Sequence, residues 1–116
     1  MTLLPLMLAA LLAQSAPELP PMPEPAACID YRRPGKPADA CDEAIAAAEN
    51  AEEKSVLLYR RAYIKIDRSE YLAYASAVAD LDEAIALFPG NWKALRERAY
   101  LYIELGEPAK AEADLD

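Results

Sequence analysis

Apolar residues recur every three or four positions through most of the chain after residue 37, and this spacing predicts helices. Pro89 and Gly90 stop one run, Asn91 is placed to cap the next, and Gly106 suits the left-handed end of that helix. Pro108 stands near the first turn of a further helix, where its missing N–H costs little. The expected helices cover residues 38–49, 52–66, 73–87 and 92–105, with a last one after Pro108. The sequence therefore predicts an all-α fold.

The first residues follow a different pattern. Leu3 to Ala13 form an apolar run of eleven residues, followed by small residues at Ser15 and Ala16. This is typical of a secretory signal peptide over residues 1–16, although no Lys or Arg precedes the run. The run is too short to span a hydrocarbon core of about 30 Å as a helix. Residues 17–27 are rich in proline, which favours extended geometry, and we interpret them as a stiff linker. A ligand for a proline-binding protein is the less favoured interpretation.

Short motifs recur along the helical part. Asp-Glu-Ala-Ile begins at Asp42 and again at Asp82, and Ala-Asp-Leu-Asp begins at Ala79 and again, 34 residues later, at Ala113. A period of this length on helix-forming residues is typical of stacked helix pairs, each of which buries its apolar face against its neighbours.

On these residues the chain resembles the tetratricopeptide repeat family, whose unit is two antiparallel helices. A unit that starts at Trp92 places residues of the required size at Leu95, Ala99, Tyr102, Gly106, Ala111 and Leu115, and the preceding half-unit does so at Ala77, Leu81, Ala84 and Pro89. Upstream, Arg61-Ala62-Tyr63 aligns with Arg98-Ala99-Tyr100 at a spacing of 37. The resemblance implies a short right-handed superhelix over residues 28–116, with a half repeat at 38–50, a repeat at 52–89 and a truncated repeat at 92–116. Leu81 and Leu115 should then have like surroundings.

The resemblance also implies where a ligand would bind. First helices of such units line a concave groove, and the ligand-contact positions of the family fall here on Val56, Tyr59, Tyr63, Ile66 and Asp67 and on Lys93, Arg96, Tyr100, Ile103 and Glu104. We take Tyr59, Tyr63, Asp67, Lys93, Arg96, Tyr100 and Glu104 as the candidate peptide-binding residues. Aromatic rings beside an arginine suit an extended peptide. The alternative is that Tyr63 and Tyr100 pack between helices with only their hydroxyls in water.

Charge and missing chemistry narrow the function. Twenty acidic against twelve basic residues give a net charge of −8, which disfavours nucleic acid as a partner. The chain has no histidine, and its three glycines lie in separate turns, so neither the commonest general base nor a phosphate loop is present. Carboxylates two apart, such as Asp80 with Asp82 or Glu112 with Asp114, diverge on a helix and are expected to be solvated. We therefore expect no enzyme activity, no cofactor, no metal and no small-molecule substrate.

Cys28 and Cys41 are the only cysteines. Two cysteines without histidine fall short of a zinc site, whereas in an oxidising compartment such a pair is usually bonded. The loop that they close has about fourteen residues, worth on the order of 3 kcal/mol. With the signal peptide, this favours an exported and periplasmic protein.

The sequence thus predicts a non-enzymatic module that binds a protein or peptide segment in its groove, without a stable membrane span. Two alternatives stay open. The repeats could self-associate as a structural subunit of an envelope assembly, through the uncovered face of the last helix, or the chain could be the N-terminal fragment of a larger protein, because it stops within a helix.

Overall fold

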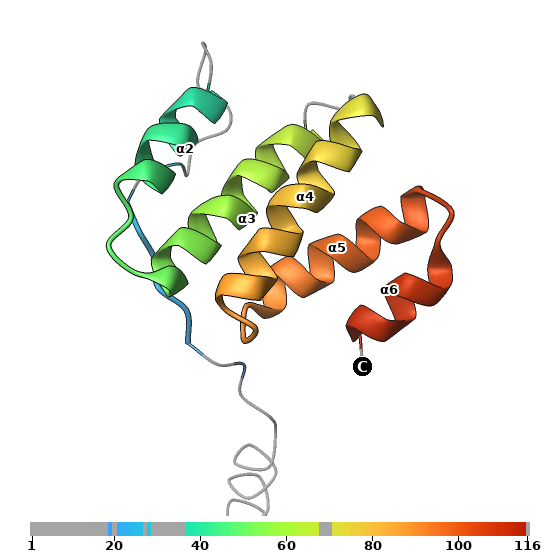
Figure 1. Cartoon of the computed structure of the whole chain (residues 1–116). Coiled ribbons are helices and arrows are strands. Elements are labelled where there is room, and N and C mark those ends of the chain that lie inside the picture. Colours follow the sequence, from blue (N-terminus) through green and yellow to red (C-terminus); the bar gives the residue numbers. More distant parts are fainter. Residues whose placement is uncertain (1–18, 20, 27, 29–36, 68–70, 116) are drawn as a thin grey trace, which may run out of the picture.

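The structure is a computed structural model that describes residues 19, 21–26, 28, 37–67 and 71–115; at positions 37–39, 71 and 72 it describes the backbone only. The helices of this part are α2 (Pro37–Ala46), α3 (Ala51–Asp67), α4 (Tyr71–Leu87), α5 (Trp92–Glu104) and α6 (Pro108–Leu115). Consecutive helices run antiparallel and lie side by side, with α3 packed most extensively on α4 and α5 on α6 (Figure 1). The predicted all-α class is confirmed for the described residues, and the right-handed superhelix stays a prediction.

The helix ends follow the predicted signals closely. The Asn91 side-chain oxygen accepts a hydrogen bond from the Ala94 backbone N–H at 3.1 Å, and Gly106 has a positive φ of 77° beyond the end of α5. The helix expected over residues 38–49 is shorter, because α2 ends at Ala46. Asn50 explains the difference: its side chain caps α3 by accepting from the Glu53 N–H at 2.8 Å, and an N-cap residue is not helical. The chain must leave α2 before it reaches this cap.

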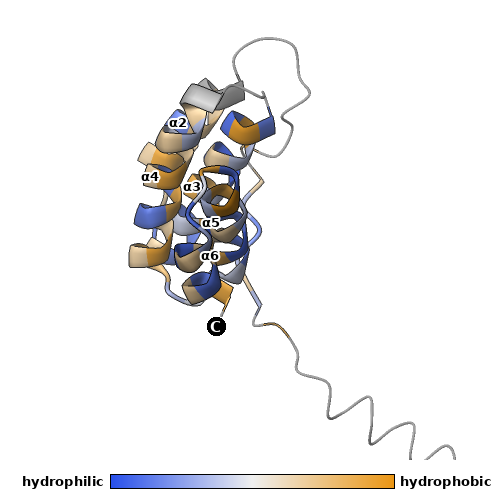
Figure 2. Cartoon of the chain, turned by 90° about the vertical axis from the view of Figure 1, so that its right-hand side faces the viewer, coloured by the Kyte–Doolittle hydropathy of each residue, from blue (hydrophilic) through white to orange (hydrophobic). Residues whose placement is uncertain are grey.

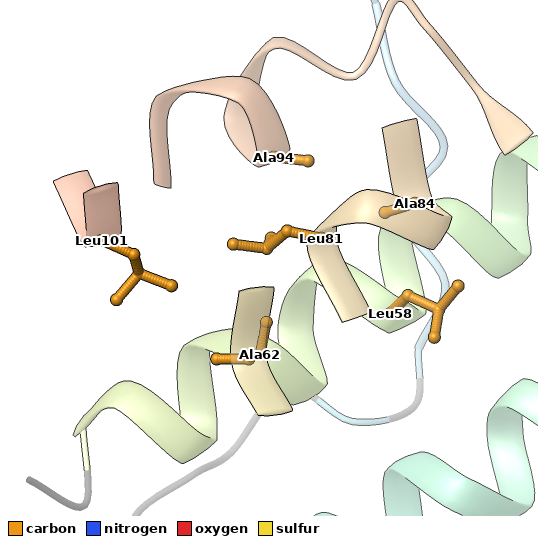
Figure 3. Packing of buried hydrophobic residues seen from close by; sticks show 7 residues of the cluster. Leu58, Ala62, Leu81, Ala84, Ala94 and Leu101 are labelled. Carbon is orange, nitrogen blue, oxygen red and sulfur yellow. The ribbon is translucent and has the colours of Figure 1, made fainter. Parts of the chain in front are cut away.

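The core forms where α3, α4 and α5 meet. Figure 3 shows Leu81 of α4 at its centre, between side chains of α3 and α5. The labelled members of the cluster are Leu58, Ala62, Leu81, Ala84, Ala94 and Leu101, all nearly inaccessible. Alanines at the contacts let the helix axes approach closely, and the leucines fill the space that remains between the helices. Ala99 and Ala111, which the repeat pattern assigns to small positions, are each only 2% exposed. Hydrophobic and hydrophilic positions alternate along the helices, as expected when one face is buried (Figure 2).

Leu81 and Leu115 do not have like surroundings, contrary to the expectation from the repeat pattern. Leu81 is fully buried, whereas Leu115 is 65% exposed. The physical reason is that α4 lies between two helices, whereas α6 packs on α5 alone among the described helices. The two leucines therefore share a position in the Ala-Asp-Leu-Asp motif but differ in burial.

Two arginines make equivalent contacts in the two helix pairs. Arg61 donates through Nε and Nη2 to both carboxylate oxygens of Asp80, at 3.0 and 2.6 Å, and through Nη1 to Asp42 at 2.8 Å. Its bidentate partner is thus on the next helix and its second partner on the preceding helix. We call this arrangement an arginine clamp.

The second arginine clamp repeats the first. Arg98 donates through Nε and Nη2 to Asp114, at 2.7 and 2.6 Å, and through Nη1 to Asp82 at 2.9 Å. The three recurring motifs of the sequence thus supply one repeated interaction, in which the motif Arg-Ala-Tyr gives the cation and the other two give the carboxylates.

The expectation that the acidic pairs are solvated is wrong for one member of each pair. The side chains of Asp80 and Asp114 are only 7% and 8% exposed, because an arginine clamp covers each of them. Lys65 also contacts Asp80, at 2.8 Å. Asp82 is 53% exposed at its side chain and pairs with Arg98 instead, so the predicted divergence of the two carboxylates is correct.

The predicted Cys28–Cys41 disulfide is present, with the two Cα atoms 4.8 Å apart and Cys41 fully buried in α2. It fastens the segment before α2 to the helical body. No helix within the described ranges is long and apolar enough to cross a membrane. The predicted signal peptide lies outside the described residues.

Candidate functional site

Helices α3 and α5 together form an open cavity of about 400 Å³. It is lined by Tyr63, Ile66 and Asp67 from α3 and by Arg96, Glu97 and Tyr100 from α5. On each helix these positions are three or four residues apart or adjacent, so they share one face. We call this the upper cavity, and the surface that carries it the α3–α5 groove.

Four of the seven candidate residues meet at the upper cavity, namely Tyr63, Asp67, Arg96 and Tyr100. Glu104 does not line the upper cavity but lies near Tyr100. Its negative charge is the main cause that raises the pKa of the Tyr100 hydroxyl. The remaining two, Tyr59 and Lys93, line a second cavity of the same groove. The groove positions taken from the repeat pattern are therefore contiguous, and they divide into two neighbouring cavities.

The aromatic rings of the groove are accessible. Tyr63 is 37% exposed and Tyr100 is 47% exposed, so more than their hydroxyls faces water. Ile103, one turn further along α5, is 56% exposed. The interpretation that the two tyrosines pack between neighbouring helices fits these values less well than a ligand-facing position does.

Arg96 carries the positive charge of the upper cavity. Its guanidinium lies 5.4 Å from the centre of the Trp92 ring, which supports a cation–π contact. Its side chain is 56% exposed, and its ion pair with Glu97 is long, at 3.8 Å. The guanidinium also hydrogen-bonds the Tyr59 hydroxyl, but two contacts do not use all five of its N–H donors, and the others can bind an incoming carboxylate or carbonyl.

Glu97 lines the upper cavity although it is not among the seven candidate residues. Its side chain is only 15% exposed, and this burial raises the pKa of its carboxyl, against a smaller lowering by Arg96. A signal was present in the sequence, since Glu97 stands four residues after Lys93 and three before Tyr100. It therefore had to share their face of α5.

Tyr59 joins the two cavities. Its ring centre lies 6.2 Å from that of Tyr63, at an interplanar angle of 47°. Burial is the main cause that raises the pKa of its hydroxyl; the charge of Glu97 adds to this, and the nearby Arg96 opposes it. Tyr59 thus stays protonated at neutral pH and can act as a hydrogen-bond donor.

The described residues offer no group of three or more His, Cys, Asp or Glu side chains that could hold a metal ion. A cavity with two tyrosines, one arginine and two carboxylates suits reversible binding of a polar and partly aromatic or aliphatic segment. No family model matches the chain, and no curated protein or solved structure matches it. The geometry of the groove is therefore the basis for the function proposed below.

Proposed function

We propose that the chain is a non-enzymatic protein-interaction module, similar in plan to the tetratricopeptide repeats, which binds an extended peptide segment in the α3–α5 groove. The observation that carries this proposal is the upper cavity, because residues from two separate helix pairs line one accessible hollow. Its volume of about 400 Å³ lies at the lower end of the range of ligand pockets, so it takes one or two side chains and not a whole folded partner.

The side chains of the groove match an extended peptide. The half-exposed rings of Tyr63 and Tyr100 can bury area against aliphatic or proline side chains at a small cost in conformational entropy. Arg96 can donate to a backbone carbonyl or, in bidentate geometry, to a carboxylate. Binding energy would then be concentrated on a few residues, as is usual for such interfaces.

Export to the periplasm is part of the proposal. It is supported by the Cys28–Cys41 disulfide, since structural disulfides persist mainly in oxidising compartments. Fractionation of a tagged full-length precursor tests it: a protein found uncleaved in the cytosol contradicts export.

The groove is tested by replacing Arg96 and Tyr100 together with alanine and measuring partner capture from the exported fraction. We expect capture to fall at least about tenfold, because two central contacts are lost, each worth on the order of 1 kcal/mol. The matched control is Lys110→Ala with Glu112→Ala on the exposed surface of α6. Both variants should keep the helical circular dichroism signal. Capture that is unchanged in the groove variant, or equally reduced in the control, contradicts the groove assignment.

A second candidate function is self-association through α6. It is favoured by Leu115, which is 65% exposed on a helix with a single packing neighbour among the described helices. A second copy that covers this leucine would bury an apolar surface that is otherwise in water. Sedimentation of the full chain tests this: we expect a dimer that Leu115→Glu disrupts, and a monomer at high concentration rejects it.

A further inference from the structure

The proline-rich segment before α2 lies against the α3–α5 groove. Its residues Met22, Pro23 and Glu24 line a cavity of about 220 Å³ together with Val56, Tyr59, Arg60, Trp92 and Lys93 of α3 and α5. We call this the lower cavity. Two of the seven candidate peptide-binding residues, Tyr59 and Lys93, belong to it. The chain's own segment thus lies where the repeat pattern places a ligand.

Polar contacts hold the segment there. A guanidinium nitrogen of Arg60 donates a hydrogen bond to the backbone carbonyl oxygen of Pro25. Glu24 lies close enough that its negative charge raises the pKa of Arg60, against a larger lowering by burial. Lys93 adds a second positive charge to the same cavity. An acidic side chain followed by a proline carbonyl therefore meets a locally basic surface, on a protein whose net charge is −8.

The apolar walls of the lower cavity suit proline. Prolines at positions 21, 23 and 25 favour the extended polyproline geometry, which has few conformations to lose on binding. Grooves that recognise such segments are lined by aromatic side chains. Here Tyr59 and Trp92 supply the aromatic rings and Val56 an aliphatic side chain.

The disulfide keeps the segment near the groove. Cys28 is three residues beyond Pro25 and is bonded to Cys41, which is fully buried in α2. Because α2 packs on α3, this bond fixes one end of the segment beside its contact surface. A short tether of this kind gives an effective concentration in the millimolar range. Even weak contacts then keep the segment bound to its own chain.

We propose that residues 21–25 are a ligand of the α3–α5 groove held in cis, and that the partner segment bound in trans has the same chemistry: extended, proline-containing and acidic. The partner in trans rests on the proposed function of the groove. Tyr59 and Tyr63 connect the two cavities, so a partner long enough to fill both must displace the cis segment. The cis segment would thereby weaken the binding of short or poorly matched partners.

Trp92 makes this proposal measurable, because it is the only tryptophan of the chain and lines the lower cavity. In the full chain, Glu24→Lys places a third cation beside Arg60 and Lys93 and should release the segment. We expect the Trp92 emission to shift to longer wavelength and acrylamide to quench it more strongly than in the unchanged protein. The matched control is Glu112→Lys, which makes the same charge change on exposed α6. Pro23→Gly is a second release variant that alters no charge.

The same proteins are then titrated with a synthetic peptide that copies residues 17–25. If the cis segment occupies the groove about nine-tenths of the time, the peptide should bind Glu24→Lys about tenfold more tightly than it binds the unchanged chain or Glu112→Lys. A control peptide of the same length and charge, in which alanine replaces every proline, should bind none of them. The proposal is overturned if Trp92 is unaffected in both release variants, if the peptide binds all proteins equally, or if the control peptide without prolines binds as well.

These results are distinguishable from a failure of the proposed function. One combination of results is that peptide binding depends on release of the cis segment while partner capture is unchanged in the Arg96 and Tyr100 variant. It supports the cis ligand and contradicts the assignment of the upper cavity. The opposite combination supports the groove and overturns the cis ligand.

Discussion

Asn91 connects the start of α5 to α3 and, through Ser55, to α4, and its replacement by alanine should cost more than the loss of an ordinary helix cap. The side chain is fully buried. Its oxygen accepts from the Ala94 N–H at 3.1 Å, and its Nδ2 donates to the Ser55 hydroxyl oxygen at 3.0 Å. Ser55 in turn donates to the Ala84 carbonyl at 2.5 Å. One amide therefore joins α3, α4 and α5 near the core.

The expected cost of Asn91→Ala is the sum of two losses. Removal of an N-cap side chain costs about 1 kcal/mol, and the loss of a second buried hydrogen bond adds about 1 kcal/mol. The free energy of unfolding should thus fall by about 2 kcal/mol. For a domain of this size such a change lowers the melting temperature by roughly 8–16 °C.

Asn50 provides a matched control within the same chain. Its side chain caps α3 with the same geometry, accepting from the Glu53 N–H at 2.8 Å, but it is exposed to water. Asn50→Ala should therefore cost about 1 kcal/mol or less, because water replaces the lost bond. Urea unfolding followed by circular dichroism compares the two variants under identical conditions.

A double-mutant cycle with Ser55→Ala tests the network itself. If the Asn91–Ser55 bond is the second loss, the two substitutions together should cost about 1 kcal/mol less than the sum of the single ones. Additive costs, or an Asn91→Ala variant no less stable than Asn50→Ala, would refute the assignment of a buried network and reduce Asn91 to a simple cap.

Three further predictions concern other contacts. Reduction of the Cys28–Cys41 disulfide should lower the free energy of unfolding by about 3 kcal/mol, measured by urea unfolding with and without reductant, and an unchanged midpoint contradicts this. Arg98→Ala should cost about 2 kcal/mol because it leaves a nearly buried carboxylate without its partner, whereas the exposed Lys54→Ala should cost no more than about 0.5 kcal/mol; equal costs would show that the clamp is not structural. Burial raises the pKa of Glu97, so as pH rises above its ordinary value of 4.5 the unfolded state ionises first and stability falls. Glu97→Gln should remove this cost and be the more stable protein at pH about 7, with the difference vanishing below pH about 4.5, and a parallel pH profile for both proteins is the contrary result.

The helices could be predicted from the sequence because their signals are local. Periodicity, the Pro89-Gly90 stop and the cap at Asn91 each act within a few residues, and α3, α4 and α5 lie within two residues of their predicted bounds at each end. The end of α2 differs from the prediction because the cap of α3 at Asn50 ends the helix earlier than the apolar spacing alone indicates. The four candidate residues that meet at the upper cavity were found through the repeat pattern, which carries information across two helices.

The contacts that could not be predicted join residues of different segments, and the apolar spacing within one segment does not show which other segment covers it. The periodicity of α4 alone makes Asp80 look solvent-facing, since it cannot show that Arg61 of a different helix covers it. The recurrence of Arg-Ala-Tyr was visible, but only the structure connects it with the two acidic motifs. The sequence contains no signal for the contact of residues 22–25 with α3 and α5, because a proline-rich segment has no amphipathic pattern that indicates which of its side chains are buried.

Arg96 and Arg98 show how position on one helix separates a structural arginine from a ligand-facing one. Two residues apart, they point to different sides of α5. Arg98 makes three short hydrogen bonds to two carboxylates and is 19% exposed at its side chain, so its donors are largely used by the fold. Arg96 is 56% exposed, and among the described residues it makes one ion pair, of 3.8 Å, and a hydrogen bond with the Tyr59 hydroxyl. An extended ligand can therefore gain hydrogen bonds from the remaining donors of Arg96 without breaking a bidentate pair between helices, whereas a ligand of Arg98 would have to break its pair with Asp114.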